Sequence, residues 1–195
     1  MDSFFAFPVA QGSGYIAKIL GNDVEKKGES LGNVINLLQR ELGEYVMTPF
    51  LGNHDTPRII NSLGASSPTN AKMACGLLSI LNGSIFVYYG DEIGMTGGYD
   101  PDCRKGFIWD ETAWDAELRR HVQLLARLKT GGRLAGDVIR ISASDDVLTL
   151  EREELTLLIN ASSRAARYCF RGREGQIAAN GFVILDADAS IIKEE

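Results

Sequence analysis

A histidine lies beside an aspartate in the stretch Asn53-His54-Asp55, and Arg58 follows three residues later. An imidazole and a carboxylate can orient a substrate by hydrogen bonding, and a carboxylate can also stabilise positive charge that develops during a reaction. The stretch follows the apolar run from Tyr45 to Leu51. A polar cluster at the end of a buried strand is where a β/α barrel carries its chemistry. We therefore expect binding or catalysis here, the alternative being a pair that only satisfies a loop.

Two further polar clusters lie downstream. Residues 88–95 read Tyr-Tyr-Gly-Asp-Glu-Ile-Gly-Met, and residues 100–104 read Asp-Pro-Asp-Cys-Arg. Carboxylates, guanidinium groups and aromatic rings are suited to holding the hydroxyls and the C–H faces of a sugar. We interpret Asp91 and Glu92 as a structural pair, because carboxylates are stabilised at a helix start. Asp100 and Arg104 are candidates for binding, with a surface ion pair as the alternative.

The elements that position these clusters alternate between helical and strand patterns. Helices are predicted over residues 31–42, from Ser67-Pro68 to Leu81, and over residues 115–129. The helix that begins at Ser67 is apolar nearly all round and should be deeply buried. Strands are predicted at residues 45–51 and 85–89, the second being an unbroken apolar run typical of a parallel sheet covered on both faces. The polar clusters should then share the face beyond the carboxyl ends of these strands.

Several other polar and aromatic residues are expected to be structural. His121 is predicted to be a half-exposed helix residue without a function. Tyr89, Trp109 and Trp114 are expected in the core or at a rim rather than as sugar platforms. The charged end, residues 193–195, is expected to be solvated.

The composition changes at residues 130–132, Thr-Gly-Gly, which we take as a domain boundary. Residues 1–130 form the first domain, and residues 131–195 are predicted to form an antiparallel β-sandwich. Its predicted strands cover residues 137–142, 147–151, 155–160, 167–170 and 182–185, with turns at 145–146, 161–163 and 172–175.

Composition narrows the class of protein. The chain has 195 residues, of which 45% are hydrophobic and 24% charged, so it can bury a substantial core. Its net charge of -6 and the lack of a basic stripe argue against a nucleic-acid partner. No apolar run reaches the roughly 18 residues of a membrane helix. Three cysteines without close spacing argue against a zinc site or a disulfide framework. The start lacks the pattern of a signal peptide, and we expect it to be preceded by further chain, which leaves localisation open.

With these motifs in order, the chain resembles the α-amylase superfamily of retaining glycoside hydrolases. The Asn-His-Asp stretch resembles the family's motif after the seventh barrel strand, and residues 88–94 resemble the segment after the eighth. The Asp-Pro-x-x-Arg stretch follows Asp55 by 45 residues (100 − 55), near the family's spacing. Residues 2–14 resemble the segment after the sixth strand. The resemblance covers essentially the whole chain.

This resemblance implies roles for individual residues. His54, with Asn53 beside it, corresponds to the imidazole that hydrogen-bonds the sugar in the cleavage subsite. Asp55 corresponds to the third carboxylate, which stabilises the oxocarbenium-like transition state. Asp100 and Arg104 correspond to the pair that holds the far edge of the same sugar. Arg58, counted with the substrate-binding group, is expected mainly to brace Asp55 or the loop.

The resemblance also implies what lies elsewhere. A retaining glycosidase needs a nucleophile and an acid/base carboxylate about 5–5.5 Å apart. The family's Gly-x-Arg-x-Asp pattern does not occur here, so both carboxylates are expected upstream of Met1. A complete barrel needs roughly 200 residues or more. The predicted fold is therefore α/β: the C-terminal portion of a (β/α)8 TIM barrel, followed by a small antiparallel all-β domain.

The predicted parent is an α-glucan-active glycoside hydrolase of α-amylase or α-glucosidase type that acts on starch or maltooligosaccharides. The chain alone is expected to be inactive. It would hold no cofactor or metal, and a calcium site would belong to the upstream part. Alternatives are a non-catalytic carbohydrate-binding or interaction module, or part of a transglycosylase or isomerase of the same superfamily. Because a barrel fragment leaves strand edges unpaired, the isolated chain is expected to self-associate.

Overall fold

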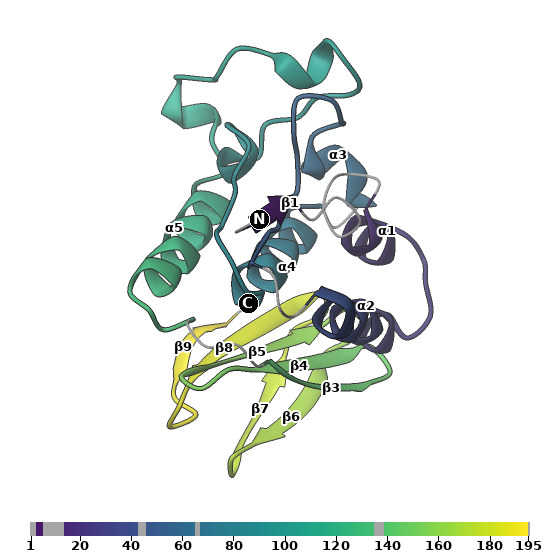
Figure 1. Cartoon of the computed structure of the whole chain (residues 1–195), viewed down its shortest axis with the longest axis vertical. Coiled ribbons are helices and arrows are strands. Elements are labelled where there is room, and N and C mark those ends of the chain that lie inside the picture. Colours follow the sequence, from purple (N-terminus) through teal and green to yellow (C-terminus); the bar gives the residue numbers. More distant parts are fainter. Residues whose placement is uncertain (1–2, 6–13, 43–45, 65–66, 135–138, 195) are drawn as a thin grey trace.

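The computed structural model describes residues 3–5, 14–42, 46–64, 67–134 and 139–194 (Figure 1). Most of the predicted segment at residues 2–14 lies outside this part of the chain. The helices α1 to α5 gather on one side of an antiparallel sheet, and a long loop that includes residues 95–114 extends at the end farthest from the sheet (Figure 1). The polar clusters belong to the helical part.

The first part contains a short parallel pairing. β1 (Ser3–Phe5) pairs in parallel with β2 (Val46–Thr48), and the connection runs through α1 (Tyr15–Gly21) and α2 (Lys27–Leu42). Beyond β2, a single parallel bridge joins Phe50 to Phe86. The described residues therefore place three chain segments side by side in parallel, as successive β/α units do.

The strand predicted at residues 85–89 is wrong. Only Phe86 forms a bridge, and the side chains of Phe86 and Val87 are 39% and 41% exposed. A buried parallel strand needs a neighbour on each side and a helix over each face. Within the described residues this segment has a bridged neighbour on one side, so its apolar run does not become a buried strand.

The central helix α4 (Ser67–Ile80) confirms the prediction of a buried helix. Its buried apolar residues share one core with α1, α2, α5 (Ala116–Thr130) and the sheet. α3 (Ile59–Ser62) packs beside it. The helix α5 begins where expected, because Asp115 Oδ1 accepts hydrogen bonds from the backbone N–H groups of Glu117 and Leu118 at 3.1 and 2.9 Å.

His121 is buried, contrary to the prediction of a half-exposed residue. Its side chain is 1% exposed, and its Nε2 lies 2.9 Å from the carbonyl oxygen of Lys72. Its ring packs on Phe182, with centroids 4.8 Å apart. Phe182 belongs to the sheet, so a strand far along the chain covers this face of the helix.

Two cations from other elements lie at the C-terminal end of α4. Lys129 Nζ donates to the carbonyl oxygens of Ser79 and Leu81 at 3.0 and 2.5 Å, and Arg152 Nε donates to that of Ile80 at 2.6 Å. Burial, and then the charge of Arg152, lowers the pKa of Lys129 to about 8. These contacts satisfy carbonyl groups that have no partner within the helix.

The second part is an antiparallel sheet of five strands with one hairpin. The sheet order is β3 (Arg140–Ser144), β4 (Val147–Glu151), β5 (Leu155–Asn160), β8 (Gly181–Asp186) and β9 (Ile191–Glu194), and β6 (Ala166–Phe170) pairs with β7 (Arg173–Ile177). The predicted bounds of β4 and β5 are confirmed. The turn predicted at residues 172–175 is wrong, because most of it lies in β7. Residues 193–194, which were predicted to belong to a solvated end, pair with β8 as part of β9.

The sheet is packed on both faces. The face toward the helices contributes apolar side chains to the large core, and α2 and α4 lie against it. The other face packs on the β6–β7 hairpin through a small cluster that includes Leu158, Tyr168 and Val183. The helical part and the sheet therefore share most of their buried apolar surface.

Candidate functional site

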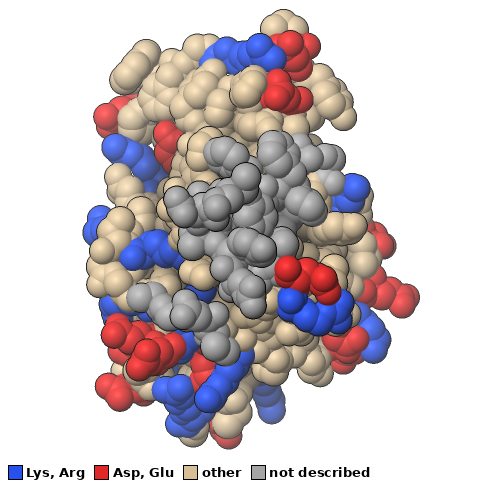
Figure 2. Space-filling view, in the orientation of Figure 1, with Lys and Arg blue, Asp and Glu red and all other residues tan. Residues whose placement is uncertain are grey.

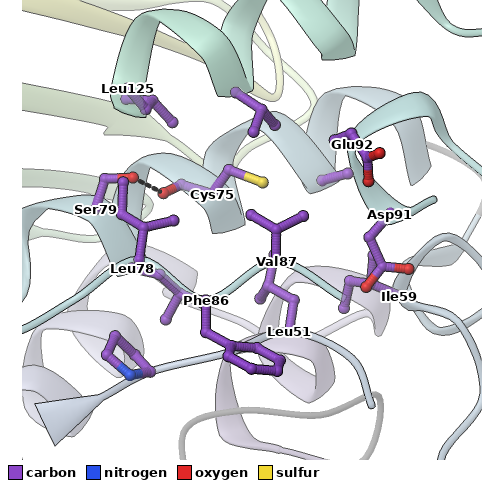
Figure 3. A pocket seen from close by; sticks show the side chains of 14 residues that line it. Leu51, Ile59, Cys75, Leu78, Ser79, Phe86, Val87, Asp91, Glu92 and Leu125 are labelled. Atoms are coloured by element: carbon purple, nitrogen blue, oxygen red, sulfur yellow. Dashed lines mark hydrogen bonds between the residues drawn. The ribbon is translucent and has the colours of Figure 1, made fainter. Parts of the chain in front are cut away.

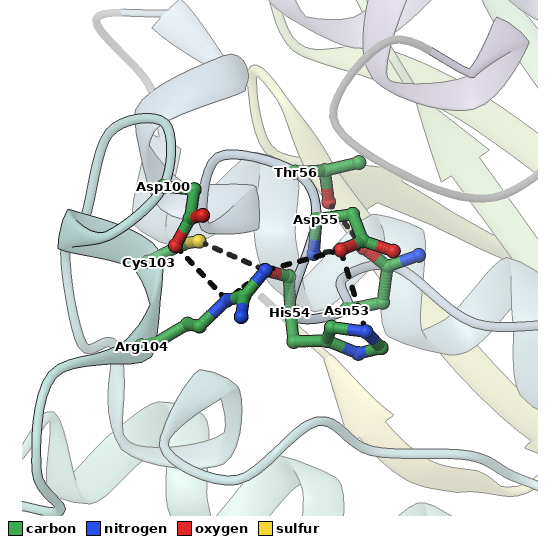
Figure 4. Close-up of polar contacts among 7 residues, drawn as sticks. All are labelled: Asn53, His54, Asp55, Thr56, Asp100, Cys103 and Arg104. Atoms are coloured by element: carbon green, nitrogen blue, oxygen red, sulfur yellow. Dashed lines mark hydrogen bonds and ion pairs between the residues drawn. The ribbon is translucent and has the colours of Figure 1, made fainter.

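The Asn-His-Asp loop directly follows β2 and is held by Asn53. The side-chain oxygen Oδ1 of Asn53 accepts hydrogen bonds from the backbone N–H of Asp55 at 2.9 Å and from Thr56 Oγ1 at 3.1 Å (Figure 4). A short amide that bonds the backbone two residues on closes a tight turn. This turn leaves the side chains of His54 and Asp55 pointing outward, 64% and 62% exposed.

The structure brings four of the predicted site residues together. His54 Nε2 lies 3.3 Å from Asp55 Oδ1, and Arg104 Nη2 lies 3.3 Å from the same oxygen. Arg104 Nε lies 3.0 Å from Asp100 Oδ1 and donates to the carbonyl oxygen of His54 at 2.9 Å (Figure 4). One guanidinium group thus bridges two carboxylates, Asp55 and Asp100, that are 45 residues apart in sequence (100 − 55).

The loop that carries Asp100 and Arg104 has its own internal support. Asp102, between them, accepts a hydrogen bond from the backbone N–H of Gly98 at 2.6 Å and pairs with Lys105 at 2.9 Å. The backbone bond from Gly98, followed by Lys105, lowers the pKa of Asp102. The short helix η3 (Asp102–Arg104) then sets Arg104 on the site side of the loop.

The role expected for Arg58 needs correction. Its side chain is 0% exposed, so a sugar at the surface cannot reach it. Arg58 Nη1 donates to Asp91 Oδ1 at 3.2 Å and to the carbonyl oxygen of Tyr89. The guanidinium carbon lies 4.3 and 4.5 Å from the ring centroids of Tyr88 and Tyr89. Arg58 braces the loop as expected, but through Asp91 rather than Asp55.

Asp91 opens the short helix η2 (Asp91–Ile93), which confirms its placement at a helix start. Burial raises the pKa of Asp91 to about 7, against the opposing effect of the Arg58 charge. Asp91 and Glu92 also line a small cavity of about 30 Å³ beside α4 (Figure 3). The other lining is mostly apolar and includes the thiol of Cys75, whose pKa burial raises to about 12. A sugar pocket measures hundreds of cubic ångströms, so this cavity is not one.

The aromatic residues near the loops differ in exposure. Trp109 and Tyr99 are 83% and 76% exposed, which places both at a rim and not in the core. Trp114 is half-buried, and its indole N–H donates to the carbonyl oxygen of Ile108 at 2.7 Å. Tyr89 is 39% exposed, and its hydroxyl donates to the carbonyl oxygen of Lys105 at 2.7 Å.

Three contributors to the site were not identified from the sequence. Asp91 is the partner of Arg58, Cys103 donates from Sγ to the carbonyl oxygen of His54 at 3.2 Å, and Asn61 accepts from the backbone N–H of Gly97 at 2.9 Å. The only signal available was that Asp91 and Cys103 lie within the recognised motifs. No sequence pattern around Asn61 indicates its contact with Gly97.

Among the described residues, no cluster of three potential metal ligands occurs, and no helix is long and apolar enough to cross a membrane. Positive and negative side chains are interspersed on the face shown in Figure 2, which therefore offers no basic stripe to a nucleic acid.

Comparison with known proteins gives a family. Residues 18–133 match the family described as "Alpha amylase, catalytic domain". The chain is 36% identical over 146 residues to a cyclomaltodextrinase of Geobacillus thermopakistaniensis (strain MAS1), and the match covers 71% of this chain and 24% of that protein. It is 32% identical over 150 residues to a maltogenic alpha-amylase of Bacillus acidopullulyticus, covering 72% of this chain and 25% of the other.

A solved structure extends the match to nearly the whole fold. The protein Ttha1563 from Thermus thermophilus aligns with a TM-score of 0.77 and 26% identity over 94% of this chain and 48% of that one. The chain thus spans about a quarter of the length of the two relatives, 24% and 25%. Its fold is the C-terminal portion of a β/α barrel followed by an antiparallel β-domain, and the chain belongs to the α-amylase family.

Proposed function

We propose that this chain forms the substrate-holding side of the active site of an α-glucan-active glycoside hydrolase. The observation that carries the proposal is the cluster of His54, Asp55, Asp100 and Arg104, which two separate loops bring together within hydrogen-bonding distance. The proposal is supported by the family match and by the position of the cluster on loops that follow the parallel segments at Phe50 and Phe86, since a β/α barrel carries its chemistry on such loops.

Three of the four members of the cluster, Asp55, His54 and Arg104, retain a group that can contact a sugar. Asp55 uses Oδ1 to bind His54 and Arg104, and within the described residues its Oδ2 accepts no hydrogen bond. His54 uses Nε2, which leaves Nδ1 for a hydroxyl, and Arg104 uses Nε and Nη2, which leaves Nη1 as a donor. One acceptor, one ring nitrogen and one donor suit adjacent hydroxyl groups, each of which can donate and accept.

Asp55 would act mainly in the transition state. Cleavage of a glycosidic bond develops positive charge on the sugar ring, and a fixed carboxylate beside the ring stabilises that charge. His54 and Arg104 hold Asp55 Oδ1 from two directions, so the carboxylate does not need to reorient as the charge develops. Asp100 would position Arg104 and, with it, the far edge of the sugar.

The nucleophile and the acid/base of a retaining double displacement would come from outside this chain. Asp55 and Asp100 are both held by the Arg104 guanidinium, at 3.3 and 3.0 Å, an arrangement that suits substrate positioning. Alone, the chain would act as a weak carbohydrate-binding module, which is the second candidate function and rests on the same exposed cluster.

The test is a nuclear magnetic resonance titration of the purified chain with maltotriose, with a parallel hydrolysis assay. We expect millimolar binding that shifts the resonances of residues 52–58 and 98–105, and no turnover. Asp55→Asn should abolish the shifts. Asp188→Asn is the matched control, because Asp188 is an exposed aspartate in the β8–β9 turn.

Two outcomes would contradict the proposal. If maltotriose leaves all resonances unchanged up to tens of millimolar, the cluster does not hold an α-glucan. If the purified chain hydrolyses maltooligosaccharides and Asp55→Asn stops it, the nucleophile and the acid/base lie within these 195 residues.

A further inference from the structure

A buried ion pair joins the two loops of the site. The side chains of Arg58 and Asp91 are 0% and 8% exposed, and Arg58 Nη1 lies 3.2 Å from Asp91 Oδ1. Arg58 follows His54 and Asp55 on the first loop, whereas Asp91 precedes Asp100 on the second. Tyr88 and Tyr89 lie against the guanidinium group. We call Arg58, Asp91, Tyr88 and Tyr89 the buried hub.

Backbone contacts next to the hub bring the loops close. The backbone N–H of Arg58 donates to the carbonyl oxygen of Gly97 at 2.9 Å. A Cβ atom at Gly97 would lie 2.7 Å from the carbonyl oxygen of Asp102 and 3.1 Å from Arg58 Cγ. A Cβ atom at Gly52 would lie 2.5 Å from Asp91 Oδ2. Gly52, before the Asn-His-Asp stretch, and Arg58, after it, therefore both contact the second loop, at Asp91 and at Gly97.

The exposed contacts of the site cannot fix this geometry by themselves. Arg104 and Asp55 are 46% and 62% exposed, and exposed ion pairs contribute little to stability. A buried pair behaves differently, because removing one partner leaves a charge without compensation in a low-dielectric interior. The hub is therefore the stronger constraint on the separation of the two loops.

The hub is also incompletely hydrogen-bonded. Among the described residues, Arg58 Nε and Nη2 and Asp91 Oδ2 are buried and accept or donate no hydrogen bond. Buried polar atoms without partners are costly and uncommon. An apolar contact of the same volume could hold the loops together at less cost, so stability alone does not explain a charged pair at this point.

We propose that Arg58 and Asp91 are positioning residues for the α-glucan site. This role rests on the proposed function. Arg58 and Asp91 fix the distance between Asp55 on one loop and Arg104 on the other. Neither residue touches the sugar. They act through the loops, and their loss separates the carboxylate from the guanidinium group that must hold the same sugar ring.

The first experiment needs no sugar. Arg104 Nε lies 2.9 Å from the carbonyl oxygen of His54 on the other loop and 3.0 Å from Asp100 Oδ1 on its own loop, so the nuclear Overhauser signal between the Arg104 Nε–H and protons of His54 reports whether the loops remain in contact. We expect the signal to vanish in Arg58→Met and to persist in part in Arg58→Lys, which keeps the charge. Asp91→Asn removes the negative charge but keeps the size of the side chain, and it should weaken the signal.

The matched control is Arg152→Met. Arg152 is a second buried arginine, 3% exposed, which bonds Ile80 at the far end of α4 from the site. Its loss should lower stability, yet in folded protein it should leave both the Arg104 signal and maltotriose affinity unchanged. Arg58→Met, compared at a temperature where both variants are folded, should weaken maltotriose binding about tenfold.

The outcomes separate this proposal from the proposed function. If Arg58→Met folds and keeps the Arg104 signal and wild-type affinity, the hub only stabilises the fold and the positioning role is wrong. If Arg58→Met does not fold, Arg58→Lys and Asp91→Asn decide in the same way. If the wild-type chain binds no maltotriose, the proposed function fails, while the Arg104 signal still shows whether the hub sets the loop contact.

Discussion

Helix α2 and the sheet approach each other so closely that a single methyl group at Gly28 should separate them. A Cβ atom at Gly28 would lie 2.6 Å from the carbonyl carbon of Asp146, 2.6 Å from the nitrogen of Val147 and 2.7 Å from its carbonyl carbon. All three are backbone atoms of the β3–β4 hairpin, which cannot rotate away as a side chain can. Gly28→Ala therefore requires the helix or the hairpin to move by about 1 Å to reach normal van der Waals separation.

Such a movement would also disturb two bonds that cap α2. Asp146 Oδ1 accepts from the backbone N–H of Lys27 at 2.8 Å, and the carbonyl oxygen of Asp145 accepts from that of Glu29 at 2.9 Å. Overpacking costs about 1–3 kcal/mol, and a lost helix cap costs about 1 kcal/mol. Alanine in place of glycine returns at most about 1 kcal/mol of helix propensity. We expect a net loss of about 2–3 kcal/mol.

Gly32, one turn later in the same helix, provides the control. A Cβ atom there would meet only side chains, at 3.3 Å from Leu148 Cδ1, 3.4 Å from Ala143 Cβ and 3.5 Å from Ile141 Cγ2. These atoms can shift by a few tenths of an ångström, so Gly32→Ala should be neutral or stabilise by up to about 1 kcal/mol.

Urea unfolding followed by circular dichroism measures both variants. A loss of about 2–3 kcal/mol in Gly28→Ala corresponds to a melting temperature lower by about 4–12 °C in a chain of this size. The predicted clash at Gly28 is refuted if Gly28→Ala is as stable as wild type within about 0.5 kcal/mol, or if Gly32→Ala is the more damaging change.

Three further outcomes are expected. Burial raises the pKa of Asp91 from 3.8 to about 7, so the contribution of Asp91 to stability is full below about pH 4 and is lost as the pH rises through 7. The free energy of unfolding of wild type, relative to that of Asp91→Asn, should therefore fall between about pH 4 and 7. An unchanged difference would contradict the raised pKa. Since burial lowers the pKa of Lys129 from 10.5 to about 8, calorimetry should show wild type gaining stability relative to Lys129→Met between pH 8 and 10.5, and a flat comparison would refute this. The exposed segment at Phe86 and Val87 should make the isolated chain self-associate, and sedimentation that shows a monomer at all dilutions would disprove it.

The sequence predicted elements whose pattern is local. The buried helix α4 and the strands β4 and β5 follow from runs of apolar residues with helical or strand spacing, and flanking turn residues marked their ends. β7 and β9 were missed because β7 is mostly charged or polar, Arg-Glu-Gly-Gln-Ile, and β9, Ile-Ile-Lys-Glu, has two adjacent apolar residues and no strand-like alternation. They become strands by pairing with a neighbour, which no local pattern shows.

The site was predictable to a similar extent. The motifs located His54, Asp55, Asp100 and Arg104, because each stands in a recognisable run of residues. The partner of Arg58 was not predictable, since Asp91 lies 33 residues away and a single sequence does not show which opposite charges meet. The burial of His121 likewise depends on a strand that lies about 60 residues further along the chain (182 − 121).

Two turns of the β-sheet place side chains at the ends of helices in the other part of the chain. Asp146, from the β3–β4 turn, caps the N-terminal end of α2, and Arg152, from the β4–β5 turn, binds the C-terminal end of α4. A recombinant chimera that kept the helices and exchanged the sheet for an unrelated one would leave both helix ends with unpaired backbone groups. These two parts of the chain must therefore be transplanted, truncated and evolved as one unit, with the crossover points for domain shuffling placed outside both.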